Sequence, residues 1–292
     1  MPAMKTLLAT LVAGHTLSVD QTVEAFEQIM TGQATPAQVG ALLAMIESRG
    51  ATVDELVGAA RVMRSKVTPI DVPAGMKVID TCGTGGDHTP TFNVSTTAAL
   101  VAATVGRPMG VGVAKHGNRT VTRTSGSSQG LEALGVKLDV PPATLSKCLD
   151  EVGFCFCFAP AHHPAMKHAM PVRLDLGFRT MFNLLGPLTN PAGASRQVMG
   201  VFDPALTEPI ANVLKDLGSE RALIVHGYKG ASHDAGGFCE MSVSGPSRVS
   251  ELRDGEVATY DVHPSKVGIS ISRLDDVLVD SPQASAEMIG RV

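Results

Sequence analysis

The sequence lacks the features that mark several common classes of protein. No run approaches the roughly 20 apolar residues that a membrane-spanning helix requires, and no cleavage pattern follows the apolar patch Leu7–Ala13. A net charge of −4 gives no electrostatic footprint for nucleic acid. Internal repeats and low-complexity tracts are also absent. These absences predict a cytoplasmic protein that acts on small molecules and binds neither membranes nor nucleic acid.

Cysteine is scarce and irregularly spaced. The five cysteines are odd in number and form no C-x-x-C pair, which argues against a structural zinc site or a redox dithiol. Cys155 and Cys157 alternate with phenylalanines, a pattern that predicts packing within a strand. We therefore expect reduced thiols without a catalytic role.

The first 66 residues have a helical pattern. Three capping boxes occur there, in which a hydroxyl caps the N3 amide and the N3 side chain returns the bond. The pairs are Ser18 with Gln21, Thr35 with Gln38, and Thr52 with Glu55. Four short helices are expected.

The sequence changes character after residues 67–75, which contain two prolines and a glycine, as is typical of a domain boundary or hinge. Beyond them, short β-rich runs alternate with helical stretches. This pattern predicts an α/β domain with a mainly parallel central sheet and flanking helices. The expected strands are residues 76–80, 109–114, 154–158, 197–202 and 221–226. We therefore predict a small helical domain at residues 1–72 and a larger α/β domain at residues 73–292.

A glycine-rich loop, Cys82–Asp87, follows the first predicted strand, which is expected to end at Asp80. It leads through Thr91–Thr97 into an alanine-rich helix, so unpaired amides and the positive end of a helix dipole meet at one small volume. Such a volume suits phosphate; the alternative is a glycine-rich turn with ordinary N-capping. The loop has neither the ending of a P-loop nor the spacing of a dinucleotide fold.

Two carboxylates, Asp80 and Asp87, flank this loop and would repel a phosphate by themselves. Either a cation mediates, or the carboxylates bond to sugar hydroxyls or backbone amides. Mg²⁺ suits the first possibility because it takes oxygen ligands and is commonly bound together with substrate phosphates. Both possibilities stay open at this point.

A basic segment, Lys115–Arg119, follows the next predicted strand, which is expected to end at Ala114. A solvated surface loop is one interpretation. The other depends on position, because ligands of such sheets bind outside the carboxyl ends of the strands. With the glycine loop, the basic segment then predicts a site for a ligand with two phosphate groups.

A third segment, Phe158–Pro191, is rich in histidine and proline. Its histidines lack carboxylate or cysteine partners, which argues against zinc. Arg173 is its most informative residue, because a guanidinium that faces a pocket holds a planar carboxylate in bidentate fashion. An ion pair with Asp175 or Glu151 is the alternative.

Together, these ordered motifs resemble those of the anthranilate phosphoribosyltransferases, from the first helices to about residue 270. Pyrimidine nucleoside phosphorylases share a related glycine loop, but Lys115–Arg119 and the block around Arg173 are similar to the transferase branch. The resemblance implies transfer of the 5-phosphoribosyl group from phosphoribosyl pyrophosphate (PRPP) to the amine of anthranilate, in tryptophan biosynthesis. It also implies a homodimer joined through the helical domain, which would include residues 165–188.

The resemblance assigns roles to residues by position. Catalytic roles fall to Lys115, Asn118 and Arg173, the last two facing anthranilate. Substrate-binding roles fall to Gly83, Gly86, Asp87, Thr91, Asn93, Ser95, Thr96, Lys115, His116, Gly117, Asn118, Arg119, Ser127 and Arg173. The Mg²⁺ cofactor would be bound by Ser95 and Glu240, with Asp234 as a further candidate.

The chain departs from the family pattern near the metal site. The Mg²⁺-binding Asp-Glu pair of the family reads Cys239-Glu240 here, and a thiol is a poor Mg²⁺ ligand. The family's Ser-Gly-Ser-Ala-Asp reads Ser125–Gln129, which removes another carboxylate. Relatives also continue beyond Val292, so the α/β domain is expected to lack an outer layer. Two alternatives therefore stay open: a non-catalytic relative that binds a phosphoribosyl ligand, and a transferase or phosphorylase with another acceptor.

Overall fold

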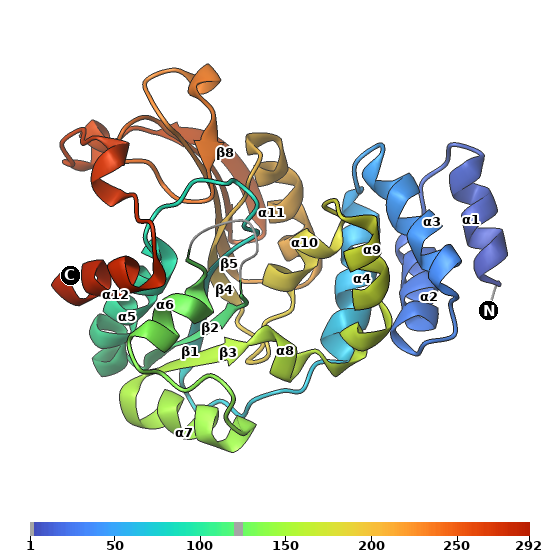
Figure 1. The fold of residues 1–292 in the computed structure, drawn as a ribbon, viewed down its shortest axis with the longest axis horizontal. Coiled ribbons are helices and arrows are strands. Elements are labelled where there is room, and N and C mark those ends of the chain that lie inside the picture. The colour runs from blue at the N-terminus through green and yellow to red at the C-terminus, as the bar shows by residue number, and fades with distance from the viewer. Residues whose placement is uncertain (1–2, 120–124) are drawn as a thin grey trace.

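The computed structural model describes residues 3–119 and 125–292, which form a bundle of short helices beside a larger sheet (Figure 1). The bundle contains α1 (Met4–Val12), α2 (Val19–Met30), α3 (Pro36–Glu47) and α4 (Val53–Ser65). The three expected capping boxes are present at the starts of α2, α3 and α4. Each box satisfies backbone N–H groups that a helix start leaves unpaired.

The described residues form a sheet of eight strands in the order β3-β2-β1-β4-β5-β7-β8, with β6 (Gly237–Phe238) paired to β5. The parallel strands are β1 (Lys77–Gly83), β2 (Val111–Gly117), β3 (Phe154–Phe158), β4 (Arg196–Gly200) and β5 (Arg221–Tyr228). An antiparallel edge follows, made of β7 (Ser247–Arg253) and β8 (Glu256–Val262). The predicted fold class is confirmed, while the antiparallel edge goes beyond the prediction.

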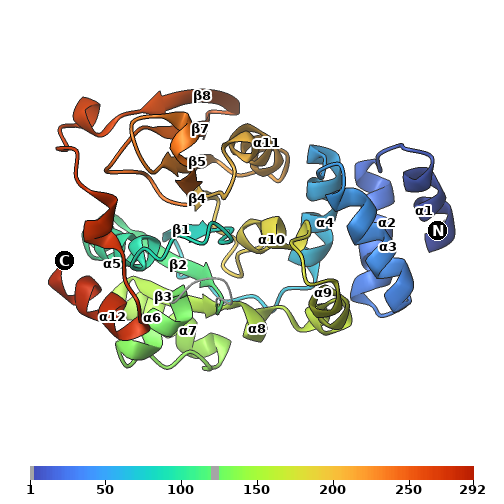
Figure 2. The same ribbon diagram turned by 45° about the horizontal axis from the view of Figure 1, so that its top comes forward.

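Helices cover both faces of the sheet. Successive residues of a strand point to opposite faces, and on β1 Ile79 belongs to the apolar cluster of α5 (Val94–Gly106). Val78 belongs to the cluster of α7 (Pro142–Val152) on the other face, together with Cys155 and Cys157. The predicted packing of Cys155 and Cys157 within a strand is therefore confirmed. α11 (Thr207–Asp216) packs on β5 and β7, farther along the sheet. Figure 2 shows these layers.

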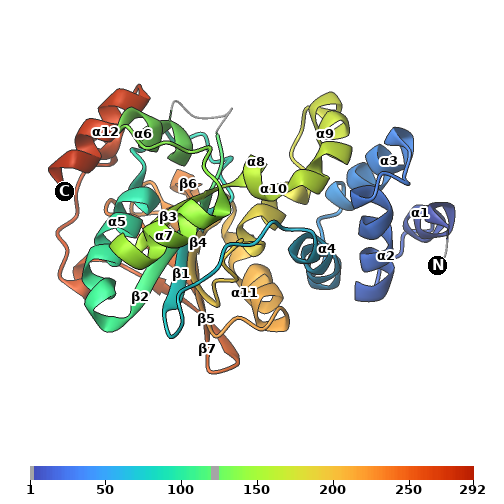
Figure 3. The same cartoon turned by 90° about the horizontal axis from the view of Figure 1, so that it is seen from below.

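The helical bundle and the sheet share one continuous apolar cluster. It runs from α2 and α3 through α4 and α10 (Phe182–Leu185) to α11 and the inner strands. At the end of α4, the guanidinium of Arg64 donates to the carbonyls of Leu188 and Leu217 at 2.7 and 3.1 Å. α9 (Met170–Leu176) lies against α3 (Figure 3). A segment from the middle of the chain thus packs with the N-terminal helices.

Three strands continue further than the sequence predicts, β5 by two residues to Tyr228 and the two that carry the site by three. β1 runs to Gly83 rather than ending at Asp80, and β2 runs to Gly117 rather than ending at Ala114. Pairing is the reason, because residues 81–83 pair with β4 and residues 115–117 pair with β3. The expectation that a loop begins at Lys115 is therefore wrong. The solvated-loop interpretation fails for Lys115 and His116, which lie buried in a strand.

The C-terminal segment returns to the carboxyl ends of the parallel strands. After β8 the chain passes through a short 3-10 helix, η7 (Leu274–Val277), to α12 (Pro282–Arg291), which packs on α6 (Ser127–Ala133) (Figure 1). An antiparallel bridge joins Leu278 to Thr91. Within the described part of the chain, no helix has the length and apolar character needed to cross a membrane.

Candidate active site

A buried lysine lies beside the glycine loop. Lys115 on β2 is 1% exposed, and its Nζ donates to the carbonyl of Thr81 on β1 and to the hydroxyl of Ser95 on α5, the latter at 3.2 Å. Burial lowers the pKa of Lys115, and the charges of Asp80 and Glu240 oppose that shift. Pairing of β2 between β1 and β3 therefore fixes an ammonium group at the start of α5.

Asp80 on β1 is the buried partner of this segment. Its Oδ1 accepts from the backbone N–H of His116 at 3.1 Å, and its Oδ2 accepts from Nδ2 of Asn190 at 2.7 Å. Burial raises the pKa of the Asp80 carboxyl, while Lys115 and these hydrogen bonds oppose the rise. Asn190 also donates to the Ala114 carbonyl at 2.8 Å, so it links the two strands.

The glycine loop is held from a distant part of the sequence. Gly85 and Gly86 have φ values of +63° and +84°, a region that favours glycine. The carboxylate of Asp87 accepts from the backbone N–H of Cys239 at 2.6 Å and from that of Thr89 at 3.1 Å. Asp80 and Asp87 thus both bond to backbone amides, one of the two possibilities that the sequence left open.

Cys239 packs directly on this loop. Its sulfur lies 3.6 Å from the Gly85 carbonyl oxygen and 3.6 Å from Oγ1 of Thr84, and the residue is only 4% exposed. A buried thiol therefore contacts the glycine loop at the position where the resemblance implies an aspartate.

The Ser95 hydroxyl and the Glu240 carboxylate, the two predicted Mg²⁺ ligands, both lie near Lys115. Glu240 is half-buried, and its charge raises the pKa of Lys115 and of Cys82. Asp234 is exposed instead, and it accepts from the Ser232 hydroxyl at 3.4 Å. Among residues 3–119 and 125–292, no three His, Cys, Asp or Glu side chains gather as a metal site. Mg²⁺ often uses one or two protein oxygens plus substrate phosphates, and this donor set fits that mode.

Hydroxyl groups gather at the start of α5. Those of Thr91 and Thr96 are buried and have no hydrogen-bond partner within the described residues. Since buried hydroxyls are normally paired, each can bond to a ligand or to an ordered water. Asn93, at the N-cap position, makes no side-chain cap bond. Its side chain contacts Ser125 and Ser285 instead.

The end of the basic motif is exposed and contacts α6. Asn118 and Arg119 are exposed, and Arg119 pairs with Glu132 of α6 at 2.5 Å. At Gly117 a Cβ atom would lie 2.4 Å from Oγ of Ser127, so the close approach requires glycine. The Ser127 hydroxyl donates to the Asn118 carbonyl at 3.5 Å. The structure thus gives Gly117, Arg119 and Ser127 contacts within the protein.

His116 connects β2 to the segment that follows β3. Its Nδ1 lies 2.9 Å from the Gly186 carbonyl oxygen, and its Nε2 lies 3.1 Å from Nε2 of His163. Because a carbonyl only accepts, Nδ1 carries the proton and Nε2 accepts from His163. Burial lowers the pKa of His116 to about 3 and that of His163 to about 4. Both rings are therefore neutral at physiological pH.

Arg173 on α9 is half-buried, and its guanidinium lies 5.2 Å from the centre of the Phe182 ring. Burial lowers its pKa. Glu151 pairs with Lys147 at 3.7 Å, and within the described residues no ion pair joins Arg173 to Glu151 or Asp175. The ion pair that was the alternative role for Arg173 is thus not formed, and the guanidinium can still bind a carboxylate ligand.

Sequence reasoning gave Arg179 no role, although it touches the glycine loop. Its Nη1 donates to the Gly86 carbonyl at 3.2 Å, and its guanidinium lies 4.2 Å from the centre of the Phe202 ring. Burial raises the pKa of Glu47 on α3, and the charge of Arg179 opposes the rise. Arg179 thus lies between the helical bundle and the loop, a neighbourhood that no local pattern signals. Asn190 and Ser285 were missed for the same reason.

Comparisons with known proteins agree with this architecture. Residues 5–67 match the family model described as the helical bundle domain of a glycosyl transferase family, and residues 75–292 match its a/b domain. Anthranilate phosphoribosyltransferase of Symbiobacterium thermophilum is 52% identical over 267 residues, which are 91% of this chain and 75% of that relative. The enzyme of that name from Methylorubrum populi is 45% identical over 292 residues, 100% of this chain and 83% of the relative.

Solved structures of enzymes with this name have the same fold. The one from Thermus thermophilus has a TM-score of 0.87 and 39% identity, and the match covers 98% of this chain and 81% of that one. The Saccharomyces cerevisiae enzyme in complex with PRPP and Mg has a TM-score of 0.84 and 26% identity, with 98% and 80% covered. The chain therefore belongs to the anthranilate phosphoribosyltransferases of this glycosyl transferase family.

Proposed function

We propose that this protein transfers the 5-phosphoribosyl group of PRPP to the amine of anthranilate and releases pyrophosphate, as a pentosyltransferase of tryptophan biosynthesis. The observation that carries the proposal is 45% identity over all 292 residues to an enzyme of that name. The yeast relative has been solved with PRPP and Mg and with 4-fluoroanthranilate, which supports the same pair of substrates and Mg²⁺ here.

Lys115 is suited to stabilise the leaving pyrophosphate. As the bond from C1′ breaks, negative charge builds on the leaving group and positive charge on the ribose. An ammonium has three N–H donors, and Lys115 uses two of them on Thr81 and Ser95. The third would remain for a phosphate oxygen. Because the strands already fix this ammonium, it stabilises the developing charge without reorganisation.

The rest of the donor site would surround the same phosphates. Bound with the donor, Mg²⁺ supplies charge neutralisation at the pyrophosphate, and Ser95 and Glu240 would hold it. The loop from Gly83 to Asp87 would present backbone amides. Thr91 and Thr96 would offer the buried hydroxyls that have no partner within the described residues.

Arg173 and Asn118 would bind anthranilate. The guanidinium would hold the acceptor carboxylate in bidentate fashion, and the Asn118 amide would orient it. No strong base is needed, because an aniline nitrogen is already a neutral nucleophile. The main tasks of the protein are to align two substrates and to exclude water, which would otherwise hydrolyse PRPP.

The loss of anthranilate fluorescence tests this proposal. Purified protein with Mg²⁺, PRPP and anthranilate should consume anthranilate, and a reaction without PRPP should not. Folded protein that leaves the fluorescence unchanged would contradict the proposal.

A second candidate is a non-catalytic relative that binds PRPP. The buried thiol of Cys239, in place of a family carboxylate, is the observation that favours it. Calorimetry separates the two candidates, because PRPP binding without turnover supports only the second.

We also propose that the enzyme acts in the cytoplasm as a homodimer joined through the helical domain of residues 1–72 with residues 165–188. The family resemblance supports this arrangement, and the contact between α3 and α9 supports the extent of the domain. Light scattering should give twice the chain mass, whereas a monomer at enzyme concentrations used for assays would contradict the dimer.

A further inference from the structure

α12 places a buried hydroxyl against the start of α5. Ser285 is fully buried, and its Oγ accepts from the backbone N–H of Asn93 at 3.0 Å and donates to Oδ1 of Asn93 at 2.8 Å. The two residues are 192 positions apart in the sequence. One hydroxyl thus holds both the main chain and the side chain of a residue in the proposed PRPP site.

These bonds fix the orientation of the Asn93 amide. The Ser125 carbonyl only accepts, so Nδ2 of Asn93 faces it, and Oδ1 accepts the proton of the Ser285 hydroxyl. The Ser125 hydroxyl also donates to Oδ1, at 2.9 Å, and Nδ2 of Asn93 donates to the Ser125 carbonyl at 3.3 Å. An amide nitrogen has two N–H groups. The second one remains for a ligand of this half-buried side chain.

Little space is left around the Asn93 amide. A Cβ atom at Gly130 of α6 would lie 2.2 Å from Oδ1 of Asn93, so α6 contacts the amide closely. The main chain next to Asn93 is held as well. The N–H of Phe92 donates to the Val277 carbonyl at 2.9 Å, and the N–H of Val279 donates to the Pro90 carbonyl at 2.8 Å. The C-terminal segment therefore fixes the loop before α5 on both sides of Thr91.

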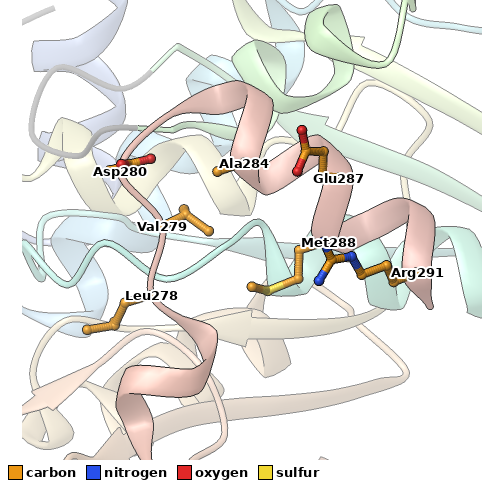
Figure 4. A pocket seen from close by; sticks show the side chains of 7 residues that line it. All are labelled: Leu278, Val279, Asp280, Ala284, Glu287, Met288 and Arg291. Carbon is orange, nitrogen blue, oxygen red and sulfur yellow. The ribbon is translucent and has the colours of Figure 1, made fainter.

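We propose that Ser285 is a positioning residue for PRPP binding, which acts by holding the Asn93 amide so that one Nδ2–H is directed to the donor. This inference rests on the proposed function. Ser285 does not line the surface pocket of about 500 Å³ beside α12. Ala284, Glu287, Met288 and Arg291, on the other face of the helix, contribute to that pocket (Figure 4).

Calorimetric titration with PRPP and Mg²⁺ tests the inference in the full chain. Ser285→Ala should raise the Kd for PRPP about tenfold, the effect of one lost hydrogen bond to a pre-organised ligand group. The Kd for anthranilate should stay within about twofold. In the Asn93→Ala background, Ser285→Ala should add much less loss than in the wild type, because only the bond to the main-chain N–H of residue 93 is left to lose.

Ser281→Ala is the matched control. The Ser281 hydroxyl accepts from the backbone N–H of Ala284 at 3.2 Å and caps α12, so its loss weakens the same helix without removing the contact to Asn93. PRPP should bind this control within about twofold of the wild type. Ser285→Cys, which keeps a donor group at this position but makes a weaker hydrogen bond, should fall between wild type and Ser285→Ala.

The inference is overturned if folded Ser285→Ala binds PRPP like the wild type, if the double variant is additive, or if Ser281→Ala weakens PRPP equally. Should Ser285→Ala not fold, the same criteria apply to Ser285→Cys. Anthranilate turnover by the wild type is measured separately. If the wild type binds PRPP without turnover, the proposed function is contradicted. The titration of the Ser285 variants with PRPP still decides whether Ser285 positions Asn93.

Discussion

The two sides of the glycine loop are built in different ways. On the side of β1 and β2, Lys115 and Asp80 are buried and bonded to neighbouring strands and to α5. On the side of the β5–β7 connection, Asp234 is exposed, and Cys239 contributes a thiol. The first side supplies the fixed positive charge and a buried network of hydrogen bonds. The second side, which departs from the family pattern, would hold a cation that arrives with the substrate.

Lys115→Met tests the first side most strongly. Removing a fixed charge at the leaving group should lower kcat by roughly 10³-fold, the magnitude seen for other pre-organised transition-state donors. Steady-state kinetics measure the effect, with the exposed Lys137→Met as the control. If folded Lys115→Met keeps more than a tenth of the activity, the pyrophosphate does not leave beside Lys115.

Asp80→Asn tests whether the same side stabilises the fold. The new side chain would place an N–H group against the Nδ2 donor of Asn190, and its neutral amide would leave the charge of Lys115 without a counter-charge. The free energy of unfolding should therefore fall by about 3 kcal/mol. Urea unfolding measures it. The exposed Asp139→Asn should be neutral, and an equally small change for both variants would show that Asp80 is not needed.

The histidine pair predicts a dependence of stability on pH. The pKa of His116 is about 3 and that of His163 about 4 in the folded protein, both below the unfolded value of about 6.5. The unfolded state therefore takes up protons first as the pH falls. The contribution of the pair to the free energy of unfolding should be fully present above about pH 6.5. Below about pH 6.5, the free energy of unfolding should fall by up to about 1.4 kcal/mol per pH unit for each histidine.

Urea unfolding from pH 7 to pH 5 checks this slope. His163→Gln removes one of the two titrating groups, so its stability should fall less steeply than that of the wild type. Equal slopes for both proteins would mean that the pair does not control the acid sensitivity.

Cys239→Asp should have the smallest effect, on the second side. A carboxylate beside the glycine loop restores the family pair, so the Mg²⁺ concentration for half-maximal activity should fall by about three- to tenfold. Cys239→Ser is the control, since it keeps the size and adds no charge. A titration curve that does not move would show that another ligand already compensates.

Local patterns predicted much of the fold. The capping boxes of α2, α3 and α4 need only residues three apart in the chain, and all three formed. Alternation of β-rich and helical runs was enough for the parallel sheet. The rest of the predicted glycine loop, residues 84–87, follows β1 as expected, whereas Cys82 and Gly83 lie within the strand.

Contacts between distant segments were the part that local patterns could not give. The strand β2 includes Lys115 because β3 pairs with it and Asp80 neutralises its charge. Alone, a lysine followed by His-Gly-Asn-Arg suggests a loop. Asn190, Arg179 and Ser285 reach the site from segments whose sequence shows only ordinary polar residues. Their importance comes from the partners that the fold brings to them.

Product stoichiometry tests the central claim most directly. Wild-type protein with PRPP, Mg²⁺ and anthranilate should release one pyrophosphate for each anthranilate consumed, because a single displacement at C1′ produces both changes. Pyrophosphate release in which anthranilate is not consumed would reveal hydrolysis or another acceptor, and would contradict the account.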